Sequence, residues 1–154
     1  MNDRLKTIVD LENYPINDLF SNKIRKLIKK CKNDLDQFSC STIPNFILPK
    51  SIETMNFELE KQIDKVFMSK KSINPYLNSK DDTSLSSNHP KRTFMKRDNG
   101  YLNSDLFDIE SEMKFLYEQE ELLKFVSACL GISPIYRWAD PLACLLYTSP
   151  SPRD

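Results

Sequence analysis

The chain has 154 residues, and its 22 lysines and arginines balance its 22 aspartates and glutamates. This length predicts a single domain, and the balanced charge argues against a dedicated binder of nucleic acid or of anionic membranes, because both classes carry a basic excess. The N-terminus has no secretory signal and no window approaches the apolar length of a membrane span, so we expect a cytoplasmic protein.

The first predicted helix begins near Asp18 or Ser21, since either side chain can cap it. Apolar residues then recur at three- and four-residue steps. They are Phe20, Ile24, Leu27, Ile28, Cys31 and Leu35. The opposite face, between Lys23 and Lys32, is basic, which is typical of a solvated helix surface. Binding of phosphate or nucleic acid through this face is the alternative.

A short strand is expected over residues 38–42, because apolar residues alternate there with small polar ones. A second helix is expected over residues 49–67, with Pro49 in its first turn and Leu48 where a Ser or Thr cap is usual. Its predicted buried stripe is Ile52, Met55, Leu59, Ile63, Val66 and Phe67. A stripe of this kind is typical of a helical core.

Residues 69–98 are polar and have little periodicity, which predicts an ordered functional loop. A turn is expected at Asn99 and Gly100. The third helical region is predicted to be capped by Asp108 and to end at Gly131, and a strand is expected over residues 135–139.

The residues alone offer no catalytic constellation. His89 is the single histidine, so an iron site of two histidines and a carboxylate cannot be assembled from this chain alone. Because His89 precedes a proline, it fits a turn or capping element better than a catalytic triad. The four cysteines lack zinc-site spacing, and we expect reduced, mostly buried thiols.

The last eleven residues, from Cys144 to Asp154, resemble the translated reverse complement of a widely used transposase sequencing adapter. We therefore expect residues 144–154 to be a non-native, irregular tail of metagenomic origin. Residues 1–143 are then expected to be the truncated N-terminal part of one domain. A natural Ser-Pro tail is the alternative, since such compositions occur at disordered termini.

Seven short motifs occur in order between residues 13 and 143. They are NYPINDL, STIPNFILP, NPYLN, NHPKR, RDNGYLNSDLF, LYEQEELLKFVSACLG and PIYRWADPLA. Together they resemble the start of an iron(II)/2-oxoglutarate-dependent oxygenase. The similar proteins are the bacterial hydroxylases (dioxygenases) and radical halogenases that act on free amino acids such as lysine.

The resemblance implies an α+β, mostly helical fragment. It would comprise the N-terminal helices and first strands of a double-stranded β-helix (jelly roll) whose barrel core is missing. It also implies that the iron ligands and the 2-oxoglutarate-binding arginine lie downstream, so the fragment itself is expected to bind neither Fe(II) nor 2-oxoglutarate and to be inactive. The rival interpretation is a small helical interaction module without catalysis.

Two residues are candidates for substrate contact in the parent enzyme. Arg97, in the motif KRDNGY, is expected to bind the carboxylate of the amino-acid substrate, because a guanidinium matches a carboxylate with two hydrogen bonds. A surface arginine is the competing interpretation. Asp140 either lines the pocket or starts a turn. No nucleic-acid or membrane partner is expected, and the sequence leaves the oligomeric state open.

Overall fold

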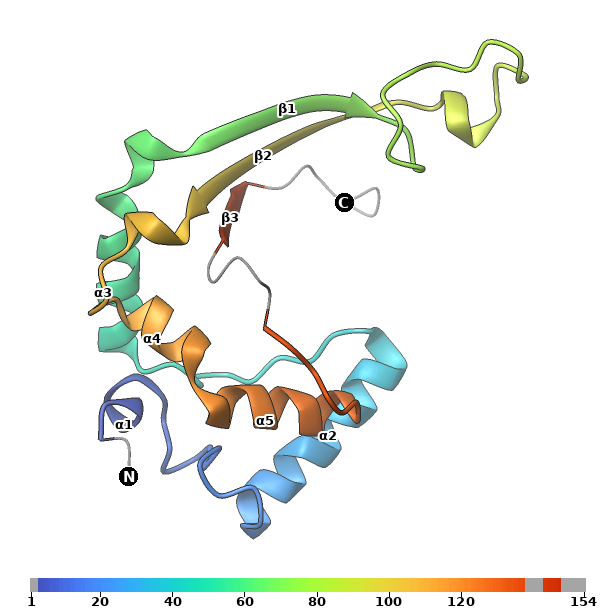
Figure 1. Cartoon of the computed structure of the whole chain (residues 1–154). Coiled ribbons are helices and arrows are strands. Elements are labelled where there is room, and N and C mark those ends of the chain that lie inside the picture. Colours follow the sequence, from blue (N-terminus) through green and yellow to red (C-terminus); the bar gives the residue numbers. More distant parts are fainter. Residues whose placement is uncertain (1–2, 138–142, 148–154) are drawn as a thin grey trace. The chain divides into compact units, whose positions relative to one another are not determined.

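The computed structural model describes residues 3–137 and 143–147. Within them the chain is α+β, with five α-helices and a three-stranded antiparallel sheet in the order β1-β2-β3 (Figure 1). The elements are α1 (Leu5–Ile8), α2 (Asn22–Phe38), α3 (Pro49–Glu60), β1 (Phe67–Ile73), β2 (Met95–Asn103), α4 (Glu112–Glu118), α5 (Glu120–Leu130) and β3 (Ala143–Tyr147). Within the described residues, no helix combines the length and apolar character needed to cross a membrane.

The chain divides into two compact units. Within the described residues, the helical unit comprises residues 3–61 and 107–137, and the sheet unit comprises residues 62–106 and 143–147. The core of the helical unit is formed by Leu5, Ile8, Val9, Ile16, Ile24, Cys31, Met55, Leu116, Phe125 and Cys129. Around it, α2 packs on α5, and α3 packs on α4. Each of α2, α3, α4 and α5 contributes at least one buried residue to this core, although Ile52 of the predicted α3 stripe is 46% exposed.

The first predicted helix is confirmed as α2. Ser21 is its N-cap, and the Ser21 hydroxyl accepts a hydrogen bond from the Ile24 amide at 3.5 Å. Ile24 and Cys31 are buried as expected. Phe20, however, is 90% exposed, so its assignment to the stripe was wrong. The Ser21 cap starts the helix one residue after Phe20, which places Phe20 outside the helical periodicity.

The strand expected over residues 38–42 is absent from the structure. Helix α2 instead continues to Phe38, and Ser39 ends it in the left-handed conformation with φ of 59°. Its amide donates to the carbonyl of Leu35, which satisfies one of the free carbonyls at the end of the helix. Residues 40–43 then form an irregular connection to α3.

The second predicted helix is shorter than expected. Pro49 does begin α3 after an uncapped Leu48, but the helix ends at Glu60. A 3₁₀ turn at Ile63–Lys65 follows, and Phe67 begins β1 with its side chain exposed. The β-branched and aromatic residues after Glu60 favour a strand, and pairing with a distant segment supplies the hydrogen bonds that a longer helix would have made.

The third helical region divides into α4 and α5. Ser111, and not Asp108, is the N-cap of α4, and its hydroxyl also donates to the Glu58 carboxylate of α3 at 2.7 Å. Gly131 ends α5 with φ of 69°, as predicted. Residues 135–137 form no strand, and the rest of the strand expected there lies outside the described residues.

The buried cysteines Cys31 and Cys129 face each other across the contact between α2 and α5. Burial, together with the neighbouring Cys31 thiol, raises the pKa of Cys129 to about 12. Of the three described cysteines, all free, only Cys40 is exposed, which agrees with the expectation of mostly buried thiols.

This difference predicts the order of cysteine alkylation. Because the thiolate is the reactive form, iodoacetamide at about pH 8 should label Cys40 rapidly and leave Cys31 and Cys129 protected. Mass spectrometry of the digested protein, with and without denaturant, measures the labelling at each site. Equal labelling of Cys40 and Cys129 without denaturant would contradict the burial of this contact.

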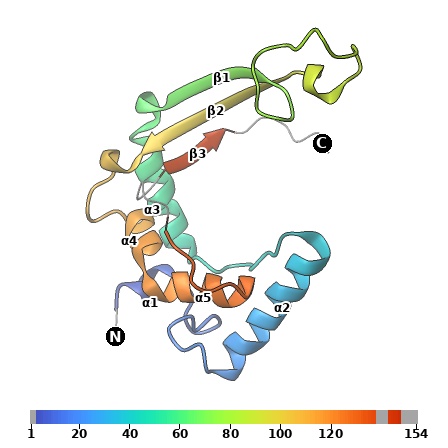
Figure 2. The ribbon, with the colours of Figure 1, turned by 45° about the vertical axis from the view of Figure 1, so that its right-hand side comes forward.

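In the sheet unit, β1 and β2 form a long antiparallel hairpin, with Phe67 opposite Tyr101 and Ile73 opposite Met95 (Figure 2). The turn expected at Asn99 and Gly100 was wrong, because both residues lie inside β2. Here the interstrand hydrogen bonds outweigh the turn preference of an Asn-Gly pair.

Residues 143–147 form β3 beside β2, with a register shift between Gly100 and Tyr101. The irregular tail that we expected after residue 143 is therefore wrong for residues 144–147. An apolar run of this kind has strand propensity, and the free edge of β2 offers unpaired backbone groups for it to pair with.

Candidate functional site

The connection between β1 and β2, residues 74–94, is organised by one buried asparagine. Asn74 is 2% exposed, and its side-chain amide donates to the Lys91 carbonyl at 2.6 Å. Its side-chain oxygen accepts from the amides of Tyr76 and Asn78, both at 3.0 Å. These contacts hold the two ends of the connection together, so the polar segment forms an ordered loop.

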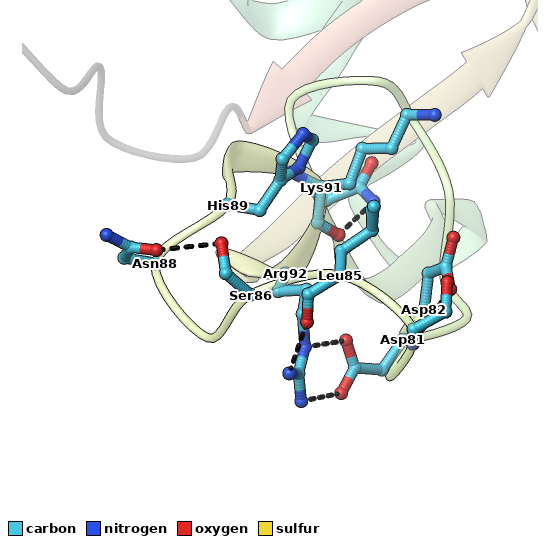
Figure 3. Close-up of polar contacts among 10 residues, drawn as sticks. Asp81, Asp82, Leu85, Ser86, Asn88, His89, Lys91 and Arg92 are labelled. Atoms are coloured by element: carbon cyan, nitrogen blue, oxygen red, sulfur yellow. Dashed lines mark hydrogen bonds and ion pairs between the residues drawn. The ribbon is translucent and has the colours of Figure 1, made fainter.

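Arg92 holds the distal part of this loop (Figure 3). Its guanidinium donates to both carboxylate oxygens of Asp81, at 2.9 and 3.0 Å, and to the carbonyl of Leu85 at 3.0 Å. His89 caps the 3₁₀ turn Pro90–Arg92, because its Nδ1 accepts from the Lys91 amide at 3.1 Å. Arg92 and His89 are therefore engaged in loop structure, and the capping interpretation of His89 is confirmed.

The ion pair between Asp81 and Arg92 predicts a pH dependence. Hydrogen bonding to Arg92 lowers the pKa of the Asp81 carboxyl from its usual range. A carboxyl with a lowered pKa in the folded state stabilises that state at neutral pH, and this stabilisation is lost as pH falls through the folded-state pKa. The Arg92 Nε–H resonance should therefore titrate with an apparent pKa below about 3.9, the ordinary aspartate value.

The Asp81→Asn variant should lose this titration, whereas Asp82→Asn should retain it, because Asp82 bonds to Ser84 and not to Arg92. NMR spectra recorded between neutral and acidic pH measure the resonance in all three proteins. A resonance in the unmodified protein that stays constant over this range would contradict the ion pair.

The predicted substrate contact, Arg97, lies on one face of the β1–β2 hairpin. Side chains alternate between the two faces of a strand, so every second residue of each strand shares this face. A cavity of about 90 Å³ is lined by Ser69, Lys71, Ile73, Arg97, Asn99 and Tyr101. We call this surface the hairpin face.

Asn99 positions the guanidinium of Arg97. Asn99 is 4% exposed, whereas Arg97 is exposed. One orientation of the Asn99 side-chain amide satisfies both its oxygen and its nitrogen. In this orientation the oxygen accepts hydrogen bonds from the Tyr101 hydroxyl at 2.7 Å and from Arg97 Nε at 3.1 Å. The nitrogen donates to the Asp98 carbonyl at 3.2 Å. Within the described part of the chain only Nε of Arg97 forms a hydrogen bond, so its two terminal nitrogens are available to a ligand.

The two faces of the hairpin differ in their charge pairing. Lys70 lies opposite Asp98 on one face, which is a favourable pairing of opposite charges. On the hairpin face Lys71 lies opposite Arg97, and like charges in this position destabilise a sheet. Among the described residues, no carboxylate forms an ion pair with Lys71 or Arg97. The hairpin face thus has the chemistry to bind a small anion.

The other candidates from the sequence are Asp140 and the basic face of the first long helix. Asp140 lies outside the described residues. The basic face between Lys23 and Lys32 belongs to α2, in the helical unit, and two of its lysines are engaged locally. Lys23 donates to the carbonyl of Glu12 at 2.9 Å, and Lys30 pairs with Asp34 at 2.6 Å.

The described residues do not fit an iron centre. No group of three or more His, Cys, Asp or Glu side chains converges among them, and the one histidine caps a turn. We therefore derive no chemical step through a metal from these residues.

Sequence reasoning identified Arg97 but missed Lys71, Asn99 and Tyr101. It missed Lys71 because residues up to 67 were assigned to a helix and the following ones to a loop. The two-residue spacing of Ser69, Lys71 and Ile73 places them on one face of a strand, and this periodicity could have indicated β1. Asn99 was assigned to a turn. It was therefore not recognised as lying two residues from Arg97 on the same face of one strand.

No family model matches the chain, and no curated protein or solved structure matches it either. Its function is therefore inferred from the hairpin face and from the motifs that resemble the oxygenases.

Proposed function

We propose that this chain belongs to a cytoplasmic iron(II)/2-oxoglutarate-dependent oxygenase that hydroxylates or halogenates a free amino acid. In this proposal the hairpin belongs to the first strands of a jelly roll, and the hairpin face binds the substrate carboxylate. The iron and 2-oxoglutarate are held by residues outside 1–143. When bound, they supply the oxidation of an unactivated carbon.

One observation carries the substrate-binding part of the proposal. The guanidinium of Arg97 is held at Nε by the buried Asn99, and its terminal nitrogens have no carboxylate partner among the described residues. A guanidinium fixed in this way can form two parallel hydrogen bonds with a carboxylate. Fixing the donor in advance reduces the entropy lost on binding, which favours recognition of a small ligand.

The first test is to read the natural coding sequence past Ala143. We expect a His-x-Asp or His-x-Gly motif within roughly thirty residues, because a facial iron site needs two histidines and a carboxylate or an open position for halide. His-x-Asp would indicate a hydroxylase, and His-x-Gly would indicate a halogenase. A clean natural reading frame without either motif would refute the oxygenase proposal.

The second test is activity of the natural full-length protein. Supplied with Fe(II), 2-oxoglutarate and a panel of free amino acids, it should form succinate in step with an oxidised or halogenated amino acid. Mass spectrometry detects both products. Succinate formation that no amino acid in the panel stimulates would count against a free amino acid as the substrate.

A further inference from the structure

Among the residues that the structure describes, the hairpin face carries two cations and no lining carboxylate. The lining residues are Ser69, Lys71, Ile73, Arg97, Asn99 and Tyr101, so the polar groups besides the cations are hydroxyls and an amide. Lys71 and Arg97 lie directly opposite each other, and their repulsion is relieved when an anion lies between them. One carboxylate compensates one of these two charges, and a second acidic group compensates the other.

We infer that the hairpin face selects a substrate with two acidic groups, an acidic amino acid of the glutamate or aspartate type and not a basic one such as lysine. This inference rests on the proposed function for the claim that the ligand is an amino-acid substrate. Arg97 binds one carboxylate through its terminal nitrogens, and Lys71 binds the second as a point charge on a flexible stem. A lysine substrate would instead bring a third cation to a cavity whose described lining contains no carboxylate.

Lys71 is therefore a specificity-determining residue, whereas Asn99 is a positioning residue that acts through Arg97. The arrangement of the two faces supports this division. The cation beside Lys71 in sequence, Lys70, lies opposite Asp98 in the strand register, so an acidic residue occupies the position across from it. Lys71 has no such partner among the described residues, and its charge is left for a ligand.

The test compares binding of L-glutamate, L-lysine and inorganic phosphate to the full chain of 154 residues. NMR follows the Arg97 Nε–H and the backbone amides of β1 and β2 as each ligand is added at constant ionic strength. We expect glutamate to bind more tightly than lysine. Lys71→Glu should weaken glutamate binding at least about two- to fivefold, because the loss of one exposed ion pair alone has an effect of this size.

Lys96→Glu is the matched control. Lys96 lies on β2 next to Arg97 but on the opposite face, across from Ser72, and the substitution changes the net charge by the same amount. It should leave the preference for glutamate unchanged. Equal weakening by Lys71→Glu and Lys96→Glu would overturn the inference, because it would show an effect of net charge alone.

Three further outcomes are decisive. Lysine binding as tightly as glutamate overturns the inference, and so does the absence of shifts at Arg97 with any ligand. Phosphate binding as tightly as glutamate overturns the assignment to an amino acid. The proposed function is tested separately, by turnover of the full-length protein. If that protein shows no iron-dependent turnover, the ligand preference of the hairpin face can still be measured by binding.

Discussion

Replacing Phe125 with alanine is expected to lower the free energy of unfolding of the chain by about 3–5 kcal/mol, the usual cost of removing a buried aromatic side chain. Phe125 is 4% exposed, and its ring stacks on that of Phe46 with a centroid distance of 6.0 Å. The Phe46 ring in turn lies beside the Tyr14 ring, with a centroid distance of 5.9 Å. Removal of the Phe125 ring therefore leaves a cavity beside Phe46 in the core of the helical unit.

Val126→Ala is the matched control for Phe125→Ala. Val126 is the next residue of α5 but is exposed, so its truncation leaves no cavity. Its effect should stay within about 0.5 kcal/mol, since alanine also has the better helix propensity. Urea denaturation followed by circular dichroism measures both variants. Similar losses for the two would contradict the core position of Phe125.

In the oxygenase that we propose, replacing Arg97 with alanine is expected to raise the KM of the full-length protein for an amino-acid substrate about ten- to hundredfold. This range follows from the roughly 1.5–3 kcal/mol that hydrogen bonds to charged groups contribute. Arg97→Lys keeps the charge but loses the planar pair of donors, so we expect an intermediate KM. Steady-state assays of succinate formation at varied substrate concentration measure the effect.

Two controls separate a substrate contact from a general effect. Lys96→Ala removes a cation from the opposite face of the same strand and should leave KM unchanged. Asn99→Ala should raise KM less than Arg97→Ala, because it releases the guanidinium without removing it. An Arg97→Ala enzyme with unchanged KM would show that Arg97 is a surface arginine, which was the competing interpretation from the sequence.

The helical unit was largely predictable from the sequence. Ser21 at the start of α2, Pro49 at the start of α3 and Gly131 at the end of α5 lie where local rules place them. These signals act between residues no more than four positions apart, so a sequence displays them directly. The failure at Phe20 has the same origin, because a periodic stripe does not by itself say at which residue a cap begins the helix.

The sheet unit was not predictable in this way. Periodicity alone assigned residues 61–67 to a helix, and the Asn-Gly pair at Asn99 and Gly100 suggested a turn. Both interpretations failed because the segment from Phe67 to Ile73 pairs with residues 95–101, across a loop of residues 74–94. Hydrogen bonds between segments this far apart leave no local signature, and they override weak local preferences.

By itself, the sequence determined where α2 and α3 begin and where α5 ends, the candidacy of Arg97 and the capping role of His89. The tertiary structure decided which side chains share a face with Arg97. The register sets Lys71 against Arg97 on one face, where two cations lie opposite each other, and Lys70 against Asp98 on the other, where a cation lies opposite an acid. A shift of one residue would exchange the two lysines between faces, since strand side chains alternate with a period of two, and only the pairing of the two distant strands selects between those arrangements.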